Sequence, residues 1–523
     1  MRLSCLALGT ALALIPGRAL AAGFTDYDET LRAPHDHLVD FSGSLRLRGE
    51  ALHNLDLDRG PTPSGELLYP VPLSDPKGQI LTRADMRLRT DVGFFLPAGG
   101  LAVKVRLDAF DGMALGSAPV GIPSASTTQS PGSAVLRLKR AYGEALTPFG
   151  LLTAGRMGNQ FGLGILANSG DCADCDSGDA SDRLAFVTPL VGHIWAVAYD
   201  LTSVGPFVPD RAGTRPIDVD PTAFVNTIST AFMRYHTPWA VRRRSAADKA
   251  TFDYGAAVSH RWQKNDVPAT YLPTVSPVAI DSRQVVARGF TATTLDAWLR
   301  LVGPGYRIEG EAALIFAHVD QASLIPGVRY KEPVTSRQIG FAVESEFGDK
   351  PGVYGVGLDL GFASGDKAPG FGAFPKVGAA PPRVGDLDGA QANPPYDTTV
   401  NNFRFNPDYR IDRILFREII GTVTDAVYLR PHVRVDPIRF SRGALELSLF
   451  SVFSFAVEPA SAPSGKRPLG VEIEPTIAYR SDFGFQAALE QATLIPLSGL
   501  DNPELGLKAK PAQVWRIRLA YSF

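Results

Sequence analysis

Long segments of this chain alternate apolar and charged side chains with a period of two residues. In one of them, Ala84, Met86, Leu88, Val92 and Phe94 alternate with Arg83, Asp85, Arg87, Arg89 and Asp91. Segments 41–50 and 101–108 repeat the pattern. Because successive side chains of a strand point to opposite faces, each segment is predicted to be a strand with one apolar and one charged face. A soluble β-sandwich would show the same alternation, so other features have to separate it from a membrane barrel.

The length of the strands favours the barrel. Many alternating segments run for about 10 to 15 residues, whereas strands of soluble proteins are typically about five or six residues long. Tilted strands that cross a bilayer need about 9–11 residues.

The connections between these segments also favour a barrel. Short turns are expected at 97–100, 147–150, 190–192, 303–305, 348–352 and 481–484. They alternate with long connections at about 112–132, 159–182, 201–222, 265–286, 320–335, 365–422, 458–468 and 496–512. Bacterial outer-membrane barrels are built with short periplasmic turns and long external loops, and a sandwich has no reason to sort its loops in this way.

The last segment has the pattern of a closing strand. Trp515, Ile517, Leu519, Tyr521 and Phe523 share one face. This ending resembles the C-terminal strand that the barrel-assembly machinery recognises in outer-membrane proteins. Tyr521 and Phe523 are therefore the expected assembly signal.

The fold class predicted is all-β: one transmembrane antiparallel barrel of eighteen strands. The strands are expected near 40–55, 80–96, 101–112, 133–146, 150–158, 183–189, 193–201, 223–236, 251–263, 287–302, 306–319, 336–347, 353–364, 423–435, 443–457, 469–480, 484–495 and 513–523. Sixteen strands is the alternative, because 183–189 and 193–201 would also fit one strand and 133–146 alternates poorly. The barrel is expected to span residues 40–523 as a single domain.

The N-terminus has the three-part pattern of a secretory signal peptide. A short positive start is followed by the apolar run 3–15 and by an Ala-x-Ala site at 19–21. The alternative is an N-terminal anchor helix. Residues 1–21 are thus expected to be removed on export, residues 22–39 to form a periplasmic segment, and the barrel to lie in the outer membrane of a Gram-negative cell envelope.

The charge balance and the motifs exclude two classes of function. The 52 Lys and Arg residues nearly cancel the 54 Asp and Glu residues, which argues against binding of nucleic acid. Neither a G-x-S-x-G elbow nor an H-E-x-x-H motif occurs, so no enzyme is predicted.

The charged faces of the strands are expected to line the lumen, because the apolar faces meet lipid. The basic residues concentrate on early strands and the last one: Arg46, Arg48, Arg83, Arg87, Arg89, Lys104, Arg106, Arg516 and Arg518. The acidic residues concentrate on later strands: Glu309, Glu311, Glu344, Glu346, Asp359, Glu446, Glu472, Glu474 and Glu490.

Opposed walls of charge set solute preference in pores. The chain is therefore predicted to be a porin through which small or anionic solutes pass. The alternative is a plugged barrel that serves as a structural scaffold or surface component of the envelope, with its lumen charges paired to one another. The long loop 365–422 contains a stretch at 411–420 with helical spacing, expected at the rim or inside the pore.

The loop 171–183 combines a CxxC motif with five aspartates. Cys172 and Cys175 are the only cysteines left after cleavage at residue 21, so a local disulfide is expected in an oxidising compartment. Closely spaced carboxylates are ligands that Ca²⁺ prefers, and Asp174, Asp176, Asp179 and Asp182 are the candidate ligands. Neighbouring arginines would neutralise the same charges. No other cofactor is expected.

Three stretches resemble an uncharacterised family of outer-membrane barrels from myxobacteria: residues 155–164, the acidic loop running into 182–186, and 361–366. The Ala-Ser-Gly-Asp turn at 363–366 and the later Asn406-Pro407-Asp408-Tyr409 also look like the alginate-export type of eighteen-stranded barrel. This likeness implies that an anionic polysaccharide or a small anion passes the arginine wall. The expected partners are outer-membrane lipid, the barrel-assembly machinery and such solutes.

Overall fold

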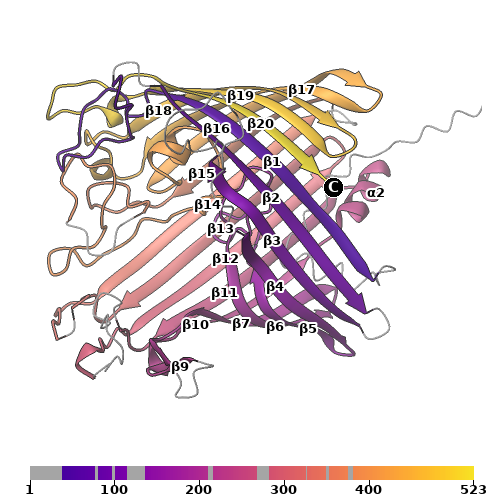
Figure 1. The fold of residues 1–523 in the computed structure, drawn as a ribbon, viewed down its shortest axis with the longest axis horizontal. Helices are drawn as coiled ribbons and strands as arrows, with labels where there is room; N and C mark the ends of the chain where they lie inside the picture. Colours follow the sequence, from indigo (N-terminus) through magenta and orange to yellow (C-terminus); the bar gives the residue numbers. More distant parts are fainter. Residues whose placement is uncertain are drawn as a thin grey trace, which may run out of the picture.

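The computed structural model describes residues 38–76, 80–96, 100–114, 136–209, 216–267, 282–325, 327–348, 353–374 and 381–523. Eighteen strands form one closed antiparallel barrel, tilted against its axis (Figure 1). They are β1 (Val39–His53), β2 (Ile80–Leu96), β3 (Leu101–Ala114), β4 (Leu136–Thr147), β5 (Gly150–Gly158), β6 (Ala180–Leu190), β7 (His193–Ser203), β10 (Val225–Arg234), β11 (Thr251–Gln263), β12 (Phe290–Gly303), β13 (Tyr306–Val319), β14 (Val334–Gly348), β15 (Tyr354–Ala363), β16 (Ala426–Phe440), β17 (Gly443–Ala456), β18 (Pro468–Ser481), β19 (Phe485–Pro496) and β20 (Ala512–Ser522).

The remaining elements lie in the connections. They are the hairpin β8 (Phe207–Pro209) and β9 (Pro216–Asp218), the helix α2 (Pro238–Ala246), the π-helix η5 (Leu415–Ile419), and the short 3₁₀ turns η2 (Pro221–Ala223), η4 (Ser282–Gln284), η6 (Pro459–Ser461) and η7 (Ser498–Leu500). Within the described ranges, no helix is long and apolar enough to span a membrane.

The barrel closes where β1 pairs with β20. The backbone N–H groups of Gly43 and Phe523 each donate to the other residue's carbonyl at 3.0 Å, and the ring of Phe523 stacks on Phe41. The prediction of eighteen strands is confirmed, and the alternative of sixteen is wrong. Strands β6 and β7 form a separate hairpin, because Val191 and Gly192 both have positive φ, as a tight two-residue turn requires.

The poor alternation of residues 133–146 has a local cause in β4. The pairing of β3 with β4 shifts between Arg106 and Leu107, so Lys139 is an extra residue in β4. Such a β-bulge reverses the side-chain parity. Leu138 therefore faces outward while Arg140 faces inward, although both positions are even.

The outer face of the barrel is apolar, and the inner face carries the charges. Large apolar side chains are exposed along the middle of the strands, among them Val103, Leu184, Val197, Leu299, Phe453 and Ile477. An apolar outer band around a polar interior is how barrels sit in the outer membrane. The chain is therefore an outer-membrane β-barrel.

The long connections gather at one end of the barrel and the short turns at the other (Figure 1). One connection at the short-turn end is longer than expected, because residues 235–250 contain α2. The Thr237 side chain caps this helix by accepting from the Ala240 N–H, Pro238 follows in the first turn, and Arg243 and Arg244 lie in the last turn. The predicted signal peptide and nearly all of the predicted periplasmic segment lie outside the described residues; β1 already begins at Val39.

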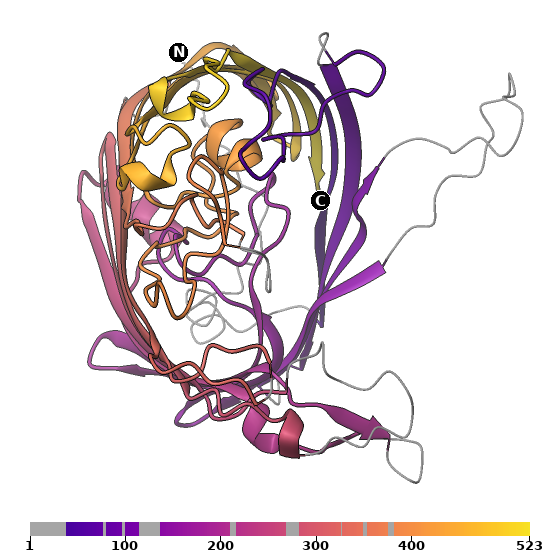
Figure 2. The same ribbon diagram turned by 90° about the vertical axis from the view of Figure 1, so that its left-hand side faces the viewer.

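Figure 2 looks into the barrel from the long-loop end and shows segments of the β15–β16 connection lying inside the ring of strands. Inward-facing alanines give them room: Ala313, Ala342, Ala363 and Ala426 are fully buried beneath a cluster that includes Phe403, Phe405, Ile411, Ile414 and Phe416. The main apolar core of the protein therefore lies within the lumen.

Candidate functional site

The predicted arginine wall lies on the inner face of neighbouring strands. Arg46 and Arg48 lie on β1, Arg87 and Arg89 on β2, Arg106 on β3, and Arg516 and Arg518 on β20; Arg83 lies at the long-loop end of β2 and is more exposed. Most of these guanidinium groups are buried, so the wall is not open to water. Lys104 is also buried and binds Glu144 at 3.0 Å.

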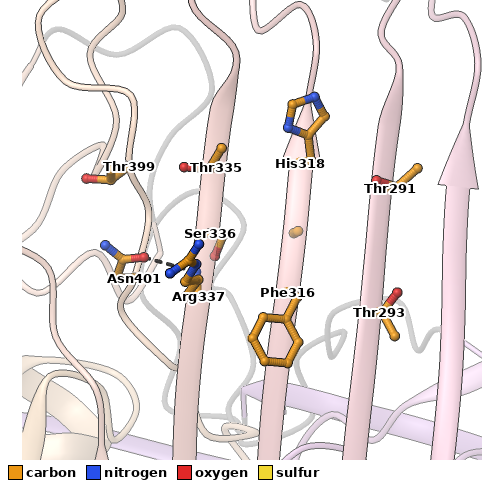
Figure 3. Close-up of a pocket in the computed structure, with 10 residues that line it drawn as sticks. Thr291, Thr293, Phe316, His318, Thr335, Ser336, Arg337, Thr399 and Asn401 are labelled. Atoms are coloured by element: carbon orange, nitrogen blue, oxygen red, sulfur yellow. Dashed lines mark hydrogen bonds between the residues drawn. The ribbon is translucent and has the colours of Figure 1, made fainter.

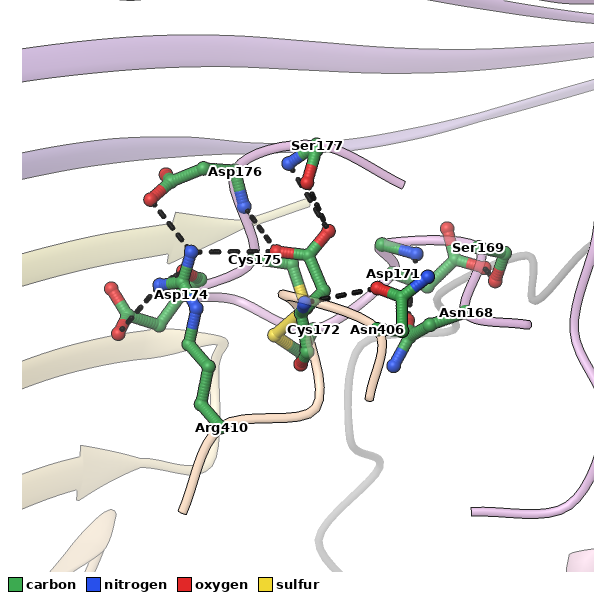
Figure 4. Close-up of a disulfide and its surroundings, with 12 residues drawn as sticks. Asn168, Ser169, Asp171, Cys172, Asp174, Cys175, Asp176, Ser177, Asn406 and Arg410 are labelled. Atoms are coloured by element: carbon green, nitrogen blue, oxygen red, sulfur yellow. Dashed lines mark hydrogen bonds and ion pairs between the residues drawn. A yellow bond between two sulfur atoms is a disulfide. The ribbon is translucent and has the colours of Figure 1, made fainter. Parts of the chain in front are cut away.

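An acidic loop, residues 159–179, covers this wall. Figure 4 shows the disulfide of this loop, its aspartates and Arg410, which binds them. Asp174 binds Arg48 at 3.1 Å and Arg516 at 3.2 Å, and Asp176 binds Arg46 at 2.9 Å. Further along, Asp171 pairs with Arg106 and Arg140, and the carbonyl of Cys175 accepts from Arg46 and Arg87. Cys172 and Cys175 are joined in a disulfide.

The arginines that bind the loop carboxylates also lower the pKa values of these carboxylates. Burial alone would raise the pKa of Asp174, but the charges of Arg417, Arg516 and Arg410 hold it well below its ordinary value. Burial likewise opposes ionisation of Asp176, and Arg410, Arg48 and Arg46 lower the pKa of that carboxyl. Both carboxylates are therefore ionised at neutral pH, and the arginines are their counter-ions.

The four aspartates proposed as calcium ligands are not brought together. Asp174 and Asp176 face arginines, whereas Asp179 accepts from the N–H of Asn168 and from Asn406. Asp182 lies on β6 and forms an ion pair with Arg156. Among the residues that the structure describes, no group of three or more His, Cys, Asp or Glu side chains is arranged to hold a metal ion.

The predicted acidic wall is covered by a second segment, residues 402–423 of the β15–β16 connection. Glu472 accepts from three consecutive backbone N–H groups at 413–415, and Arg413 binds Glu474 at 3.1 Å. Tyr409 donates to Glu344. The expected helix at 411–420 is only the five-residue π-helix η5.

Most other acidic residues of this wall pair with arginines of the barrel strands, whereas Glu311 accepts from the backbone N–H of Gly164. Glu309 binds Arg307 and accepts from the indole N–H of Trp298, and Glu346 binds Arg434. The remaining pairs are Asp359 with Arg430, Glu446 with Arg480 and Arg434, and Glu490 with Arg516, Arg518 and Arg413.

The two inserted segments also bind each other. Arg410 and Arg417 of the second segment pair with Asp174 and Asp176 of the acidic loop. Asp408 accepts from the backbone N–H groups of Asp176 and Ser177. The middle of the lumen is therefore bridged from the basic wall to the acidic wall, and most of the wall charges are neutralised.

A cavity of about 470 Å³ remains between this bridge and the inner face of β6, β7, β10, β11 and β12. Its wall is made of small side chains, among them Ala196, Ala198, Ser229, Ala231, Ala257, Ser259 and Thr294. The charged groups that line it are Asp179, Arg183, Asp200, Arg261 and Asp296; Arg183 and Asp200 pair with each other at 2.6 Å. Neither Arg261 nor the small wall was singled out from the sequence.

The short-turn end of the lumen is narrowed by apolar side chains and by the turn before α2. Met157, Val187, Ile194, Met233 and Trp298 form a buried cluster there. Tyr235 packs near Trp298.

The turn before α2 is held to the inner face of the neighbouring strands. The His236 N–H and ring both bind Asp253, which also binds Arg300 at 2.7 Å. The connection thus turns inward across the periplasmic mouth.

A second pocket, of about 620 Å³, lies at the long-loop end of β12, β13 and β14 (Figure 3). Thr291, Thr293, Phe316 and Arg337 line it, on the same strand faces as the exposed Leu295 and Leu299. It is therefore a feature of the outer surface and is separate from the lumen.

No family model and no curated protein sequence matches the chain. The resemblance to myxobacterial and alginate-export barrels therefore stays a prediction.

Among solved structures, the chain is similar to OpdK of Pseudomonas aeruginosa, crystallised with vanillate (10% identity, 92% of this chain and 98% of that chain, TM-score 0.44), and to OpdL of the same organism (10%, 92% and 99%, 0.45). OmpT, an outer-membrane protein of Vibrio cholerae, matches at 9% identity over 93% and 97% with a TM-score of 0.37. The assignment of the fold as a closed barrel is based on the strand pairings described above and not on these similarities.

Proposed function

We propose that this barrel is a diffusion channel for small polar solutes, and that the solutes pass along the β6–β12 side of the lumen. The observation that carries the proposal is the cavity of about 470 Å³ on that side. Elsewhere the lumen is bridged by the two inserted segments, whose charged side chains form ion pairs with the walls. The small side chains of β7, β10 and β11 leave this side clear.

A preference for anionic solutes needs cations that are free to meet them. The arginines of β1, β2, β3 and β20 are bound to carboxylates or carbonyl groups of the protein. Arg261 lines the cavity, is exposed and forms no salt bridge with a described residue. Attraction of anionic groups is therefore assigned to Arg261, and the arginine wall is assigned to holding the acidic loop.

Planar-bilayer recordings of the purified full chain test the channel. Steady conductance that falls when Ala198 is replaced by a large side chain (A198W) supports passage along this wall. The control is Val197→Trp, one residue away and on the lipid face. Equal conductance of the two variants would place the passage elsewhere.

The second candidate function is a plugged barrel that serves as a structural component of the envelope. It is favoured by the interlocked inserted segments and by the apolar cluster at the periplasmic end. Absence of conductance from folded wild-type protein over the whole voltage range would support it.

We also propose that the barrel-assembly machinery recognises the last strand through Tyr521 and Phe523. Both side chains are exposed on the outer face. Tyr521→Ala leaves the stack of Phe523 on Phe41 in place and removes a ring contact with Phe485. It is expected to lower the amount of barrel in the outer membrane by more than its effect on the unfolding free energy of refolded protein accounts for.

A further inference from the structure

The lumen cavity is lined at its floor by one buried carboxyl group, that of Asp296, and a second one, that of Glu311, lies close to Asp296 but outside the lining. Asp296 is 6% exposed and Glu311 is 2% exposed. No described Lys, Arg or His forms a salt bridge with either group. One oxygen of each, Asp296 Oδ1 and Glu311 Oε1, has no hydrogen-bond partner.

The other oxygen of Glu311 is already used by the fold. Glu311 Oε2 accepts from the N–H of Gly164 at 2.7 Å, which fixes the tip of the acidic loop to β13. Asp296 has no such task, and it lines the cavity. Its unpartnered oxygen is therefore the polar group in the cavity that most needs a donor.

An unpaired carboxylate in a buried site is costly unless it meets a cation or a hydrogen-bond donor. Two neighbouring carboxyl groups raise that cost, because like charges repel at short range. A protonated amine supplies both a positive charge and three N–H donors in a small volume. The described residues place no such positive charge beside Asp296, so a bound solute would have to supply it.

The other end of the cavity carries the opposite charge. Arg261 donates through Nε to Thr227 at 3.1 Å and forms no salt bridge with a described carboxylate, although Asp179 of the same cavity is near enough to feel its charge. In the pairing of β11 with β12, Arg261 lies opposite Ala292 and Ala257 lies opposite Asp296. Four residues of strand, roughly 13 Å, therefore separate the two levels, and the long arginine side chain shortens the gap.

We infer that this cavity binds a small zwitterionic solute, with its ammonium group at Asp296 and its carboxylate at Arg261. The inference rests on the proposed channel function and names the class of solute that the passage selects. The small walls of Ala, Ser and Thr between the two ends fit a flexible aliphatic spacer with a few polar groups.

Calorimetric titration of the purified full chain in detergent tests this site without requiring conductance. The probe is 6-aminohexanoate, which carries both charges. Its N-acetyl derivative, 6-acetamidohexanoate, keeps the carboxylate and loses the ammonium. The first is expected to bind at least about tenfold more tightly, the usual effect of one hydrogen bond to a charged group.

Variants separate the two ends of the site. Asp296→Asn should weaken binding of 6-aminohexanoate about tenfold and abolish its advantage over the acetyl derivative. Arg261→Gln should weaken both probes. The control is Asp182→Asn on the outer surface, which should leave binding unchanged.

Three results would overturn the inference: no binding of 6-aminohexanoate to folded wild-type protein, equal affinity for the two probes, or unchanged affinity in Asp296→Asn. If Asp296→Asn does not fold, the comparison of the two probes on the wild-type protein and on Arg261→Gln decides. Binding without conductance would leave the site standing and reject the channel. Conductance without binding would do the reverse.

Discussion

At the scale of single residues, two ion pairs have the same bidentate geometry and opposite burial. Arg89 donates through Nε and Nη2 to Asp108 at 2.8 Å in the lumen, and Arg156 donates in the same way to Asp182 at 2.8 Å near the rim. The side chains of the first pair are 7% and 0% exposed, and those of the second are 52% and 50% exposed. The two pairs therefore differ chiefly in burial, and Arg89 in addition donates to the Gly170 carbonyl of the acidic loop.

Arg89→Ala is expected to lower the unfolding free energy by about 3–5 kcal/mol, because it removes the bidentate partner of the buried Asp108 carboxylate. Arg156→Ala is the matched control and should cost about 1 kcal/mol or less, since water screens the exposed pair. Urea titration of the barrel in lipid vesicles measures both. Equal losses would show that the lumen around Arg89 is wet.

Asp425 carries a residue-scale prediction about pH. Burial raises the pKa of this carboxyl to about 7, and one of its oxygens has no hydrogen-bond partner. The folded state therefore holds a proton that the unfolded state releases at about pH 4, so stability is lost as pH rises from about 4 through 7.

Asp425→Asn should remove this dependence, because asparagine keeps the acceptor oxygen and tolerates the positive φ of 46°. The difference in unfolding free energy between the variant and the wild type should grow from pH 5 to pH 8 in favour of the variant. A difference that does not change with pH would contradict the assignment.

At the scale of elements, the strands were predictable and the loops were not. The alternation of side chains is a local property of the sequence. It therefore located all eighteen strands to within a few residues at their ends, and it identified which arginines face inward. The positions at which the long loops begin and end can also be predicted from the sequence, because they follow from the strand ends. Where such a loop goes is decided by contacts between distant segments, such as Asp174 with Arg516 and Asp176 with Arg410.

The lumen therefore differs from the sequence-based picture in its contents. The five aspartates at 171–182 suggested either a cation or arginines as counter-ions, and composition alone did not choose between them. Arg413 and Arg417 stand in the segment interpreted only as a helix, and Arg410 directly precedes it. In the structure, Arg413 binds the acidic wall, whereas Arg410 and Arg417 bind the acidic loop. Arg261 and Asp296 were missed because each shares its strand with only one other Asp, Glu, Lys or Arg, so neither strand shows a charged face in the sequence.

The acidic loop gives a prediction of its own. The double variant Asp174→Asn, Asp176→Asn removes the ion pairs that hold the loop to β1, β20 and the second inserted segment. Single-channel conductance is expected to rise severalfold as the loop leaves the wall. Asp182→Asn, outside these contacts, is the control.

The wild-type loop should respond to acid in the same direction. The arginines lower the pKa values of Asp174 and Asp176, so their stabilisation of the docked loop is complete above about pH 4 and is lost as pH falls further. Conductance at pH 7 and pH 5 should be equal. A rise already between these two values would mean that another group controls the loop.

At the scale of the whole molecule, the inside and the outside of the barrel are set by one register. Val197 is exposed on the outer face and Ala198 is buried on the inner face of β7. Val197→Arg is expected to cost about 2–4 kcal/mol of unfolding free energy in vesicles, because it places a charge in lipid. Ala198→Arg should cost less and should reduce conductance, since its charge enters the cavity. The reverse order would mean that the strand faces are interchanged.

The ion pairs of Asp174 also bear on the seam between the first and the last strand. That seam is shorter than its neighbour: ten residue pairs join β1 to β20, whereas fifteen join β1 to β2. From the inside, Asp174 binds Arg48 of β1 and Arg516 of β20, and Glu50 of β1 also binds Arg516. These carboxylates hold the two strands together across the seam. The acidic loop, which restricts passage through the barrel, thus also opposes the separation of β1 from β20. A solute or a low pH that releases the loop would therefore weaken the barrel at this one seam.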